Sequence, residues 1–259
     1  MPEGHSLHRL AGQLAELVGH QVEASSPQAR FDAAAVDRSR VTDVQAYGKH
    51  LLLDTSAGLA VHVHLGMRGK WLRFSPVTGP ALKQVRLRLT TPGLAWDLIA
   101  PSTCELLTDD RREALLASLG PDPLRPEADR DEARRRLQAY RGSVGAALMD
   151  QAVVAGVGNV FRAEILHALG IAPDRPAREV GDEEFEALWL RLRAMMTQGV
   201  EDGRIITVAA PPGGSLTDVP EDQSRRVYKQ AACYDCGTPV VTTTVSGRTS
   251  YACPRCQPA

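Results

Sequence analysis

Four of the five cysteines lie in the last 27 residues of the chain, in a pattern typical of a metal site. Cys233, Cys236, Cys253 and Cys256 are spaced as C-x2-C-x16-C-x2-C, which falls within the range of four-thiolate zinc sites. Zn²⁺ takes four such ligands tetrahedrally and keeps no open position, so we expect one structural Zn²⁺ per chain that stabilises the fold of this segment. The alternative, two disulfides, is disfavoured in a cytosolic chain.

The start of the chain, MPEGHSLHRL, offers a second chemistry. The small residue after Met1 favours removal of that methionine, which would expose the secondary amine of Pro2. An α-amino group titrates at about 7.7–8, so part of it is neutral and can attack an electrophilic carbon. The product is an iminium, which withdraws electrons as a lysine Schiff base does. Glu3 beside it has the chemistry of a general acid and base. Alternatively, this dipeptide only starts a helix, because Pro fixes φ and Glu suits the positive helix end.

The first half of the chain predicts a helix followed by a sheet structure. Residues 4–18 carry leucines at helical spacing, which indicates an amphipathic helix. Residues 20–110 contain short apolar or alternating stretches between glycines, as antiparallel strands do. The predicted strands are Val41–Val44, His50–Leu53, Leu59–Leu65, Lys70–Phe74, Val85–Leu89 and Leu94–Leu98. One helix followed by many short strands favours a β-sandwich.

The second half predicts helices and then a small hairpin. Three prolines in residues 120–127 mark a domain boundary. The predicted helices are Asp129–Tyr140, Val144–Gln151, Val160–Leu169 and Asp182–Gly199, followed by a loop at 201–223. Between the cysteine pairs, Val240–Val245 and Arg248–Ala252 read as a β-hairpin with Arg248 at its tip. We therefore expect an α+β multidomain chain with domains at 1–120, 121–223 and 224–259.

Composition and charge are those of a globular protein with local basic regions. The 259 residues are 43% hydrophobic and carry a net charge of −1. No run of eighteen apolar residues and no signal-peptide layout is present, so we expect a cytoplasmic protein without a membrane partner. Residues 38–90 hold nine Lys/Arg against two Asp, and residues 224–259 hold five against one. Such regions suit phosphate binding, although ordinary surface charge gives the same count.

Five motifs run in order along essentially the whole chain: PEGH at the start, YGKHLLL at 47–53, HVHLGMRG at 62–69, MDQAVVAGVGNVFRAE at 149–164 and the terminal CPRCQ. With these motifs the chain resembles the formamidopyrimidine-DNA glycosylase/endonuclease VIII family. The resemblance implies an N-terminal β-sandwich with a leading helix, a helix–two-turn–helix domain and a C-terminal zinc ribbon. It also implies damaged DNA as the partner, bound in a cleft between lobes. We expect a monomer of bacterial type that acts on nucleoid DNA.

The same resemblance implies roles for individual residues. Pro2 would form the Schiff base with the sugar C1′, and Glu3 would act as acid and base. Lys49, Asn159 and Arg248 would contact phosphates near the lesion, and a helix N-terminus such as that at Asn159 presents N–H groups to an anion. Three further matches, Asp150, Gln151 and Glu164, have either a supporting role or ordinary packing and capping roles.

The loop after His64 carries the residues expected to act in base flipping. An enzyme that attacks C1′ must rotate the damaged nucleotide out of the duplex and fill the space that it leaves. Met67 is flexible and apolar, which suits insertion into the base stack, and Arg68 could reach the orphaned base. The alternative places Met67 in the core, but Gly66 and Gly69 bracket it as a turn and favour exposure.

Two departures from the family pattern bear on the substrate. Where many relatives carry a second Glu, this chain has Ser6, preceded by His5. Segment Thr90–Trp96 is short and lacks the Arg and Phe that formamidopyrimidine enzymes insert opposite the lesion. The second departure favours endonuclease VIII, and hence oxidised pyrimidines.

The expected function is therefore a bifunctional DNA glycosylase/AP lyase of base excision repair that ends in β,δ-elimination. The alternatives are an 8-oxoguanine/formamidopyrimidine glycosylase of the same fold, a non-catalytic zinc-ribbon DNA-binding protein, or an accessory zinc-ribbon module of a transcription or translation complex.

Overall fold

A computed structural model describes residues 2–77 and 79–258, so Met1, whose removal the sequence predicts, lies outside the described residues. The chain divides into two compact units. The first contains Pro2, Glu3 and residues 7–118, and the second contains Gly4–Ser6 and residues 119–258. Among the described residues, no helix is long and apolar enough to cross a membrane.

The first unit begins with the predicted amphipathic helix. Helix α1 (Gly4–Leu14) continues into a single 3₁₀ turn, Ala15–Leu17, before Val18 becomes extended. The leucines at helical spacing face the core, and Leu7, Leu14 and Leu17 are at most 1% exposed. The prediction of an α-helix to residue 18 is therefore wrong in its last turn, where a 3₁₀ turn leads into the extended Val18.

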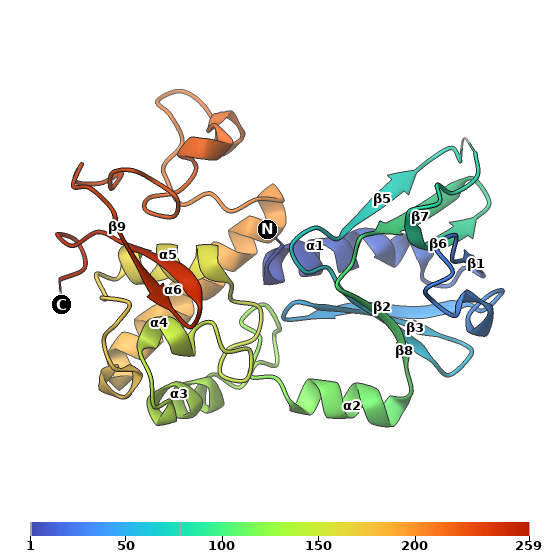
Figure 1. Ribbon diagram of the computed structural model, residues 1–259, viewed down its shortest axis with the longest axis horizontal. Coiled ribbons are helices and arrows are strands. Elements are labelled where there is room, and N and C mark those ends of the chain that lie inside the picture. The colour runs from blue at the N-terminus through green and yellow to red at the C-terminus, as the bar shows by residue number, and fades with distance from the viewer. Residues whose placement is uncertain (1, 78, 259) are drawn as a thin grey trace. The chain divides into compact units, whose positions relative to one another are not determined.

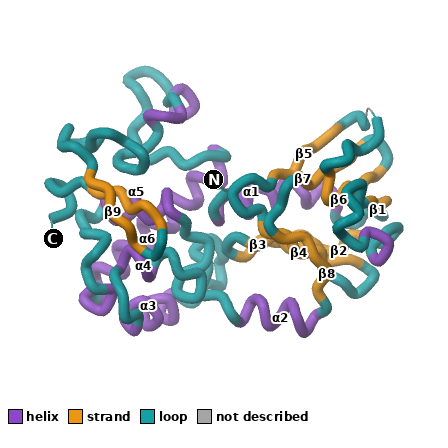
Figure 2. The backbone as a smooth tube through the Cα atoms, in the orientation of Figure 1, coloured by secondary structure: helices purple, strands orange, loops and turns teal. Residues whose placement is uncertain are grey.

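Two four-stranded antiparallel sheets follow in this unit (Figures 1 and 2). One sheet has the order β2 (Val41–Tyr47), β3 (His50–Thr55), β4 (Ala60–His64) and β8 (Thr103–Leu107). The other has the order β1 (Glu23–Ser25), β6 (Val85–Thr91), β7 (Leu94–Ile99) and β5 (Lys70–Phe74). Both sheets contribute to one apolar core, with Leu51 and Val63 from one and Leu87 and Leu98 from the other. The β-sandwich with a leading helix is confirmed.

A short helix covers part of the outer face of the β2-β3-β4-β8 sheet. Leu115 and Leu116 of α2 (Asp109–Ala117) pack on Leu52, Ala60 and Leu107 of that sheet. The sequence predicted neither α2 nor the neighbouring strand β8. Helix α2 has no fully buried residue and so no apolar stripe, and four of the five β8 residues are half-buried without alternation.

The second unit is helical and ends in a hairpin. Its helices are α3 (Arg130–Ala139), α4 (Val144–Ala147), α5 (Asn159–Ala168) and α6 (Asp182–Asp202). All four occur where the sequence predicted helices, but α4 ends at Ala147 instead of Gln151. Helix α6 runs past the predicted end to Asp202, where Gly203 takes the left-handed conformation that ends helices. Residues 203–240 are mostly loop (Figure 2).

The predicted hairpin is present as β9 (Val241–Val245) and β10 (Arg248–Ala252). Ser246 and Gly247 form its turn with φ values of 50° and 69°. Positive φ at both central residues is typical of the two-residue turns that match the twist of antiparallel strands. Arg248 follows directly and pairs with Val245. The helices and this segment share one core, because Cys233 and Cys253 are buried together with Phe161, Leu188 and their neighbours.

Candidate active site and metal centre

The four C-terminal cysteines lie together. Their sulfur atoms are all within 4.8 Å of one another. The Sγ–Sγ distances are 3.9 Å for Cys233–Cys256 and 3.5 Å for both Cys236–Cys253 and Cys236–Cys256. A tetrahedral ion with Zn–S bonds of about 2.3 Å separates its sulfurs by about 3.8 Å, whereas a disulfide bond is about 2.05 Å long. The geometry fits one ion bound by four thiolates, and all four cysteines are free of disulfides.

Backbone hydrogen bonds shape the two cysteine turns. Cys233 N–H donates to the Thr238 carbonyl at 2.8 Å, and Gly237, with φ 70°, donates to the Cys233 carbonyl at 2.9 Å. At the second pair, the Gln257 side chain accepts from Cys253 N–H at 2.9 Å and donates to the Ile171 carbonyl at 2.8 Å. Gln257 is 4% exposed. Gln257 ends the CPRCQ motif, but no spacing rule gives a role to a glutamine next to the last ligand, so its contacts could not be predicted.

Helix α5 holds the start of the cysteine segment through Glu164, whose side chain is fully buried. One carboxylate oxygen accepts from the backbone N–H groups of Val227 and Tyr228, at 3.1 and 2.8 Å. The other accepts from Arg226 N–H at 2.9 Å and from the Thr207 hydroxyl. A carboxylate that accepts several backbone N–H bonds tolerates burial as an anion. Glu164 therefore fixes residues 226–228.

A second contact from α5 reaches the metal centre itself. Nε2 of His167 lies 3.2 Å from Sγ of Cys233, and its Nδ1 lies 3.8 Å from an Asp235 oxygen. His167 is 5% exposed, and burial lowers its pKa. His167, Cys233 and Asp235 form a second group whose ligand atoms lie close together. The four-cysteine set fits the ion better, because it supplies four thiolates at tetrahedral separations.

Asn159 is bonded to the hairpin at the residue next to Arg248. Asn159 starts α5 and is 7% exposed. Its amide donates to the Thr249 carbonyl at 3.0 Å, and its oxygen accepts from Arg162. Arg162 also donates to the Thr249 carbonyl, at 2.9 Å. The first turn of α5 is thus bonded to the residue that follows the exposed Arg248. The phosphate-binding roles of Asn159 and Arg248 stay predictions.

The start of the chain is bound to the GVGN loop. Gly4 N–H donates to the Gly156 carbonyl at 2.8 Å, and a Cβ on Gly4 would lie 2.9 Å from the Gly156 Cα. Gln151 organises this loop, since its side chain accepts from Gly156 N–H and donates to the Val157 carbonyl, both at 3.0 Å. Its role in the loop backbone is also why the helix predicted to reach Gln151 ends early.

Pro2 and Glu3 precede this anchored glycine. Pro2 is half-buried, and the Glu3 side chain is fully buried. Glu3 stands at the N-cap of α1, but its side chain makes no capping bond to that helix. His5, near the place where relatives carry a second Glu, packs edge-on against Phe161 with ring centroids 5.3 Å apart. Burial lowers the pKa of His5 to about 4, so it is neutral at cellular pH.

Lys49 and Met67 lie on tight turns of the first unit. Gly48, with φ 56°, and Lys49 form the two-residue connection between the paired residues Tyr47 and His50. Met67 is 69% exposed, which contradicts its alternative placement in the core. A Cβ on Gly69 would lie 2.3 Å from the Leu65 carbonyl oxygen, so this turn requires glycine. Arg68 beside Met67 is exposed as well.

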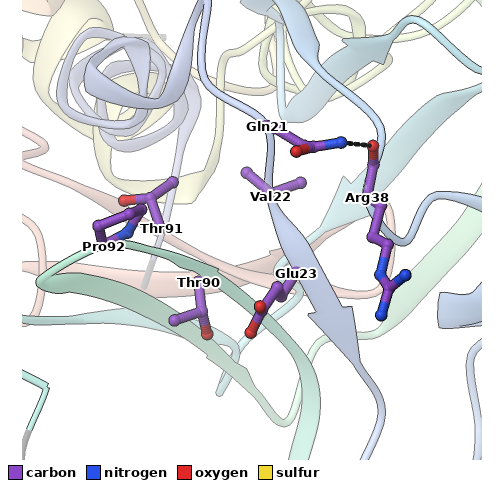
Figure 3. A pocket seen from close by; sticks show the side chains of 7 residues that line it. All are labelled: Gln21, Val22, Glu23, Arg38, Thr90, Thr91 and Pro92. Carbon is purple, nitrogen blue, oxygen red and sulfur yellow. Dashed lines mark hydrogen bonds between the residues drawn. The ribbon is translucent and has the colours of Figure 1, made fainter.

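A cavity of about 710 Å³ lies elsewhere in the first unit (Figure 3). It is lined by residues 21–23, Arg38 and residues 90–92, and the Gln21 amide donates to the Arg38 carbonyl at 2.7 Å. Residues 90–92 belong to the segment used above to choose a substrate class, which forms the β6–β7 hairpin. None of the predicted site residues lines this cavity.

Comparison with known proteins gives matches over the whole chain. Residues 1–114 match the formamidopyrimidine-DNA glycosylase N-terminal domain, and residues 119–210 match the formamidopyrimidine-DNA glycosylase H2TH domain. Endonuclease 8 1 of Mycobacterium tuberculosis is 40% identical over 267 residues, which cover 99% of this chain and 100% of that protein. Formamidopyrimidine-DNA glycosylase of Xanthomonas campestris is 33% identical and covers 96% of each chain.

Solved structures agree with these matches. The MutM (Fpg) protein of Thermus thermophilus superposes with a TM-score of 0.78 at 29% identity and covers 99% of this chain and 98% of its own. Lactococcus lactis Fpg in complex with DNA that contains N7-benzyl-Fapy-dG gives a TM-score of 0.81 over 100% of both chains. At 20% identity, the second match supports the fold alone.

Proposed function

Because this chain belongs to the formamidopyrimidine-DNA glycosylase/endonuclease VIII family, and so is a DNA glycosylase of base excision repair, we propose that it is bifunctional and excises oxidised pyrimidines. The identity to endonuclease 8 1 proteins, 40%, exceeds the 33% to the Xanthomonas formamidopyrimidine-DNA glycosylase and supports this choice. The observation that carries the proposal is the start of the chain. Pro2 and the buried Glu3 are followed at once by Gly4, whose backbone is bonded to the GVGN loop.

In the proposed mechanism Pro2, freed of Met1, attacks the sugar C1′ and the damaged base leaves. Glu3 donates and accepts protons while the sugar ring opens. The resulting iminium acidifies the C2′ hydrogen, so that β- and then δ-elimination leave phosphates at both ends of the gap. Lys49, Asn159 and Arg248 bind the phosphates around the lesion. Met67 fills the space of the flipped nucleotide, and Arg68 reaches the orphaned base.

The four cysteines in this proposal hold one structural Zn²⁺. Bound by four thiolates, the ion cross-links two turns and takes no part in the reaction, since no coordination position is open. The cysteines position the hairpin and its tip residue Arg248. Metal analysis of the purified protein should give one zinc per chain, and Cys236→Ser should lower the zinc content and the thermal stability. A zinc-free protein with unchanged stability would contradict this role.

Borohydride trapping tests the reaction itself. The protein, with Met1 removal checked by intact mass, is incubated with duplexes that contain thymine glycol, 5-hydroxyuracil, 8-oxoguanine or an abasic site. We expect a covalent adduct with the pyrimidine lesions and the abasic site, and its loss in Pro2→Gly. Glu3→Gln should lose base excision but still be trapped at the abasic site. A mature protein that cleaves without a trapped adduct would remove Pro2 from its role.

The lesion panel also separates the alternatives. The 33% identity to a formamidopyrimidine-DNA glycosylase favours an 8-oxoguanine or formamidopyrimidine substrate as the second candidate. Faster excision of 8-oxoguanine than of thymine glycol would establish that candidate. Binding to every duplex without excision or trapping would instead establish a non-catalytic DNA-binding protein.

A further inference from the structure

The four cysteine sulfurs of the metal centre differ in how far solvent can reach them. Cys233 and Cys253, the first cysteine of each pair, are 2% and 0% exposed. Cys236 and Cys256, the second cysteine of each pair, are half-buried. A dissolved reagent needs an accessible sulfur, so of the four ligands only Cys236 and Cys256 are open to attack.

The two enclosed sulfurs each accept a hydrogen bond. Nε2 of His167 lies 3.2 Å from Sγ of Cys233. The backbone N–H of Cys256 donates to Sγ of Cys253 at 3.4 Å. A thiolate carries no hydrogen and only accepts, so Nε2 of His167 bears the hydrogen in the first bond. Both sulfurs are therefore hydrogen-bonded as well as enclosed.

The two half-buried cysteines differ in this respect. Oγ1 of Thr238 lies 3.3 Å from Sγ of Cys236, so the hydroxyl donates to that thiolate. In the part of the chain that the structure describes, Sγ of Cys256 has only other sulfurs within hydrogen-bond distance, those of Cys233 at 3.9 Å and Cys236 at 3.5 Å. The residue two positions after Cys236 is Thr238. The residue two positions after Cys256 is Pro258, which has neither a hydroxyl nor a backbone N–H.

This difference decides which sulfur is the better nucleophile. A donor stabilises the electron pair that a thiolate gives to an incoming electrophile, and the bond to that donor weakens as the pair is given up. Cys236 carries such a donor. Among the described donors and ligands, Cys256 alone combines an accessible sulfur with the absence of an N–H or O–H partner.

We propose that Cys256 is a modification site, at which the metal centre reacts first with small electrophiles of the α,β-unsaturated carbonyl class. With a maleimide, the S–C bond forms as the C=C π bond breaks. The electron pair moves to the carbon next to the carbonyl, which takes a proton from water and leaves hydroxide. The product is an uncharged thioether, so Cys256 no longer holds the ion as a thiolate. The proposal rests on the zinc centre proposed above and is independent of the Pro2 chemistry.

Alkylation mapping of the zinc-loaded full chain tests the proposal. The protein, with its zinc content measured first, is treated with a limiting amount of N-ethylmaleimide. Mass spectrometry locates the label in molecules in which one metal ligand is labelled, and a coloured chelator follows zinc release. We expect these labels on Cys256, with Cys236 about 3–10-fold slower because it loses part of a hydrogen bond to charged sulfur on attack. Zinc release should keep pace with labelling of Cys256.

Two kinds of variant separate access from hydrogen bonding. Thr238→Val removes the hydroxyl donor and should raise the labelling rate of Cys236 by about 3–10-fold. Its matched control, Thr243→Val, changes an exposed threonine of β9 and should leave the rate unchanged. Cys256→His keeps a zinc ligand but removes the reactive sulfur, so maleimide should release its zinc about 3–10-fold more slowly, whereas Cys236→His should release it at the parent rate.

Cys104 of the first unit is an internal reference for the reagent. Burial raises its pKa to about 12, so this thiol should be labelled slowly and equally in every variant.

Several results would overturn the proposal and leave the zinc centre intact. These are single labels on Cys236, labels divided evenly between Cys236 and Cys256, or an unchanged labelling rate of Cys236 in Thr238→Val. Labelling of the parent protein decides the question if a variant loses its zinc. A purified chain without zinc would overturn the zinc centre and the proposal together, whereas absence of borohydride trapping would remove the Pro2 chemistry alone.

Discussion

The Glu164 contacts predict a large loss of stability from a change of a single atom. Glu164→Gln keeps the shape of the side chain but replaces one carboxylate oxygen with an NH₂ group. If that group faces Val227 and Tyr228, two backbone N–H bonds are lost. If it faces Arg226 and Thr207, the Thr207 hydroxyl can turn and accept, so that only the Arg226 N–H meets another donor. We expect the second orientation.

The magnitude follows from the bonds that remain. Loss of one hydrogen bond to a charged acceptor costs about 1.5–3 kcal/mol, and each of the two bonds kept by the neutral amide weakens by about 1 kcal/mol. The sum is about 3.5–5 kcal/mol, because the site is fully buried and water cannot replace the missing partner. For a domain of this size the melting temperature should fall by roughly 7–20 °C.

Thermal and urea unfolding of the zinc-loaded protein measure this effect, with Glu183→Gln on the exposed face of α6 as the matched control. The rate of zinc release to a chelator should rise in Glu164→Gln and not in Glu183→Gln, since residues 226–228 lead into the first cysteine pair. A stability loss below about 1 kcal/mol in Glu164→Gln would refute the reasoning, as it would mean that the buried carboxylate contributes no more than an exposed hydrogen bond.

Three further outcomes are expected. The pKa of His5 is lowered to about 4 from 6.5, so the stability that neutral His5 contributes is complete above pH 6.5 and is lost as the pH falls toward 4. This contribution is worth about 3 kcal/mol. His5→Phe should therefore reduce the change in the urea-unfolding free energy between those pH values by that amount. Gly4→Ala should lower the free energy of unfolding by about 1–3 kcal/mol, because its Cβ meets the Gly156 backbone. It should also slow borohydride trapping. Unchanged trapping would show that the start of the chain tolerates displacement. Arg248→Ala should reduce the salt dependence of DNA binding by about one phosphate contact. Fluorescence anisotropy measures this dependence, with Arg178→Ala as the exposed-residue control. An unchanged slope of affinity against salt concentration would count against the contact.

Local patterns predicted the elements that have strong local signals. The C-x2-C pairs brought four sulfurs to tetrahedral separations, and the leucine spacing of α1 placed Leu7 and Leu14 in the core. Ser246-Gly247 was recognised as a turn because only a few residue types accept positive φ at such positions. Strand β8 escaped notice because four of its five residues are half-buried without alternation, and helix α2 because six of its nine residues are exposed.

Contacts between residues far apart in the chain could not be predicted from local sequence patterns. Glu164 was noticed, but its partners at 226–228 lie more than sixty residues later and bond through backbone groups, which carry no residue signature. Side-chain hydrogen bonds likewise join His50 to His62 and His62 to Glu105, residues that strand register brings together. Register depends on how the whole sheet packs, so no local window could pair Glu105 with His62.

Helix α5 meets the cysteine-bearing segment at each turn of its length, through Asn159, Glu164 and His167. We therefore expect that the segment does not fold independently of α5, although it is short and carries its own metal ligands. Grafting residues 224–258 onto another scaffold would leave Cys233 and Cys253 exposed to solvent where they are now enclosed. A chimera between relatives should place its crossover before residue 159, so that helix and ribbon are inherited together.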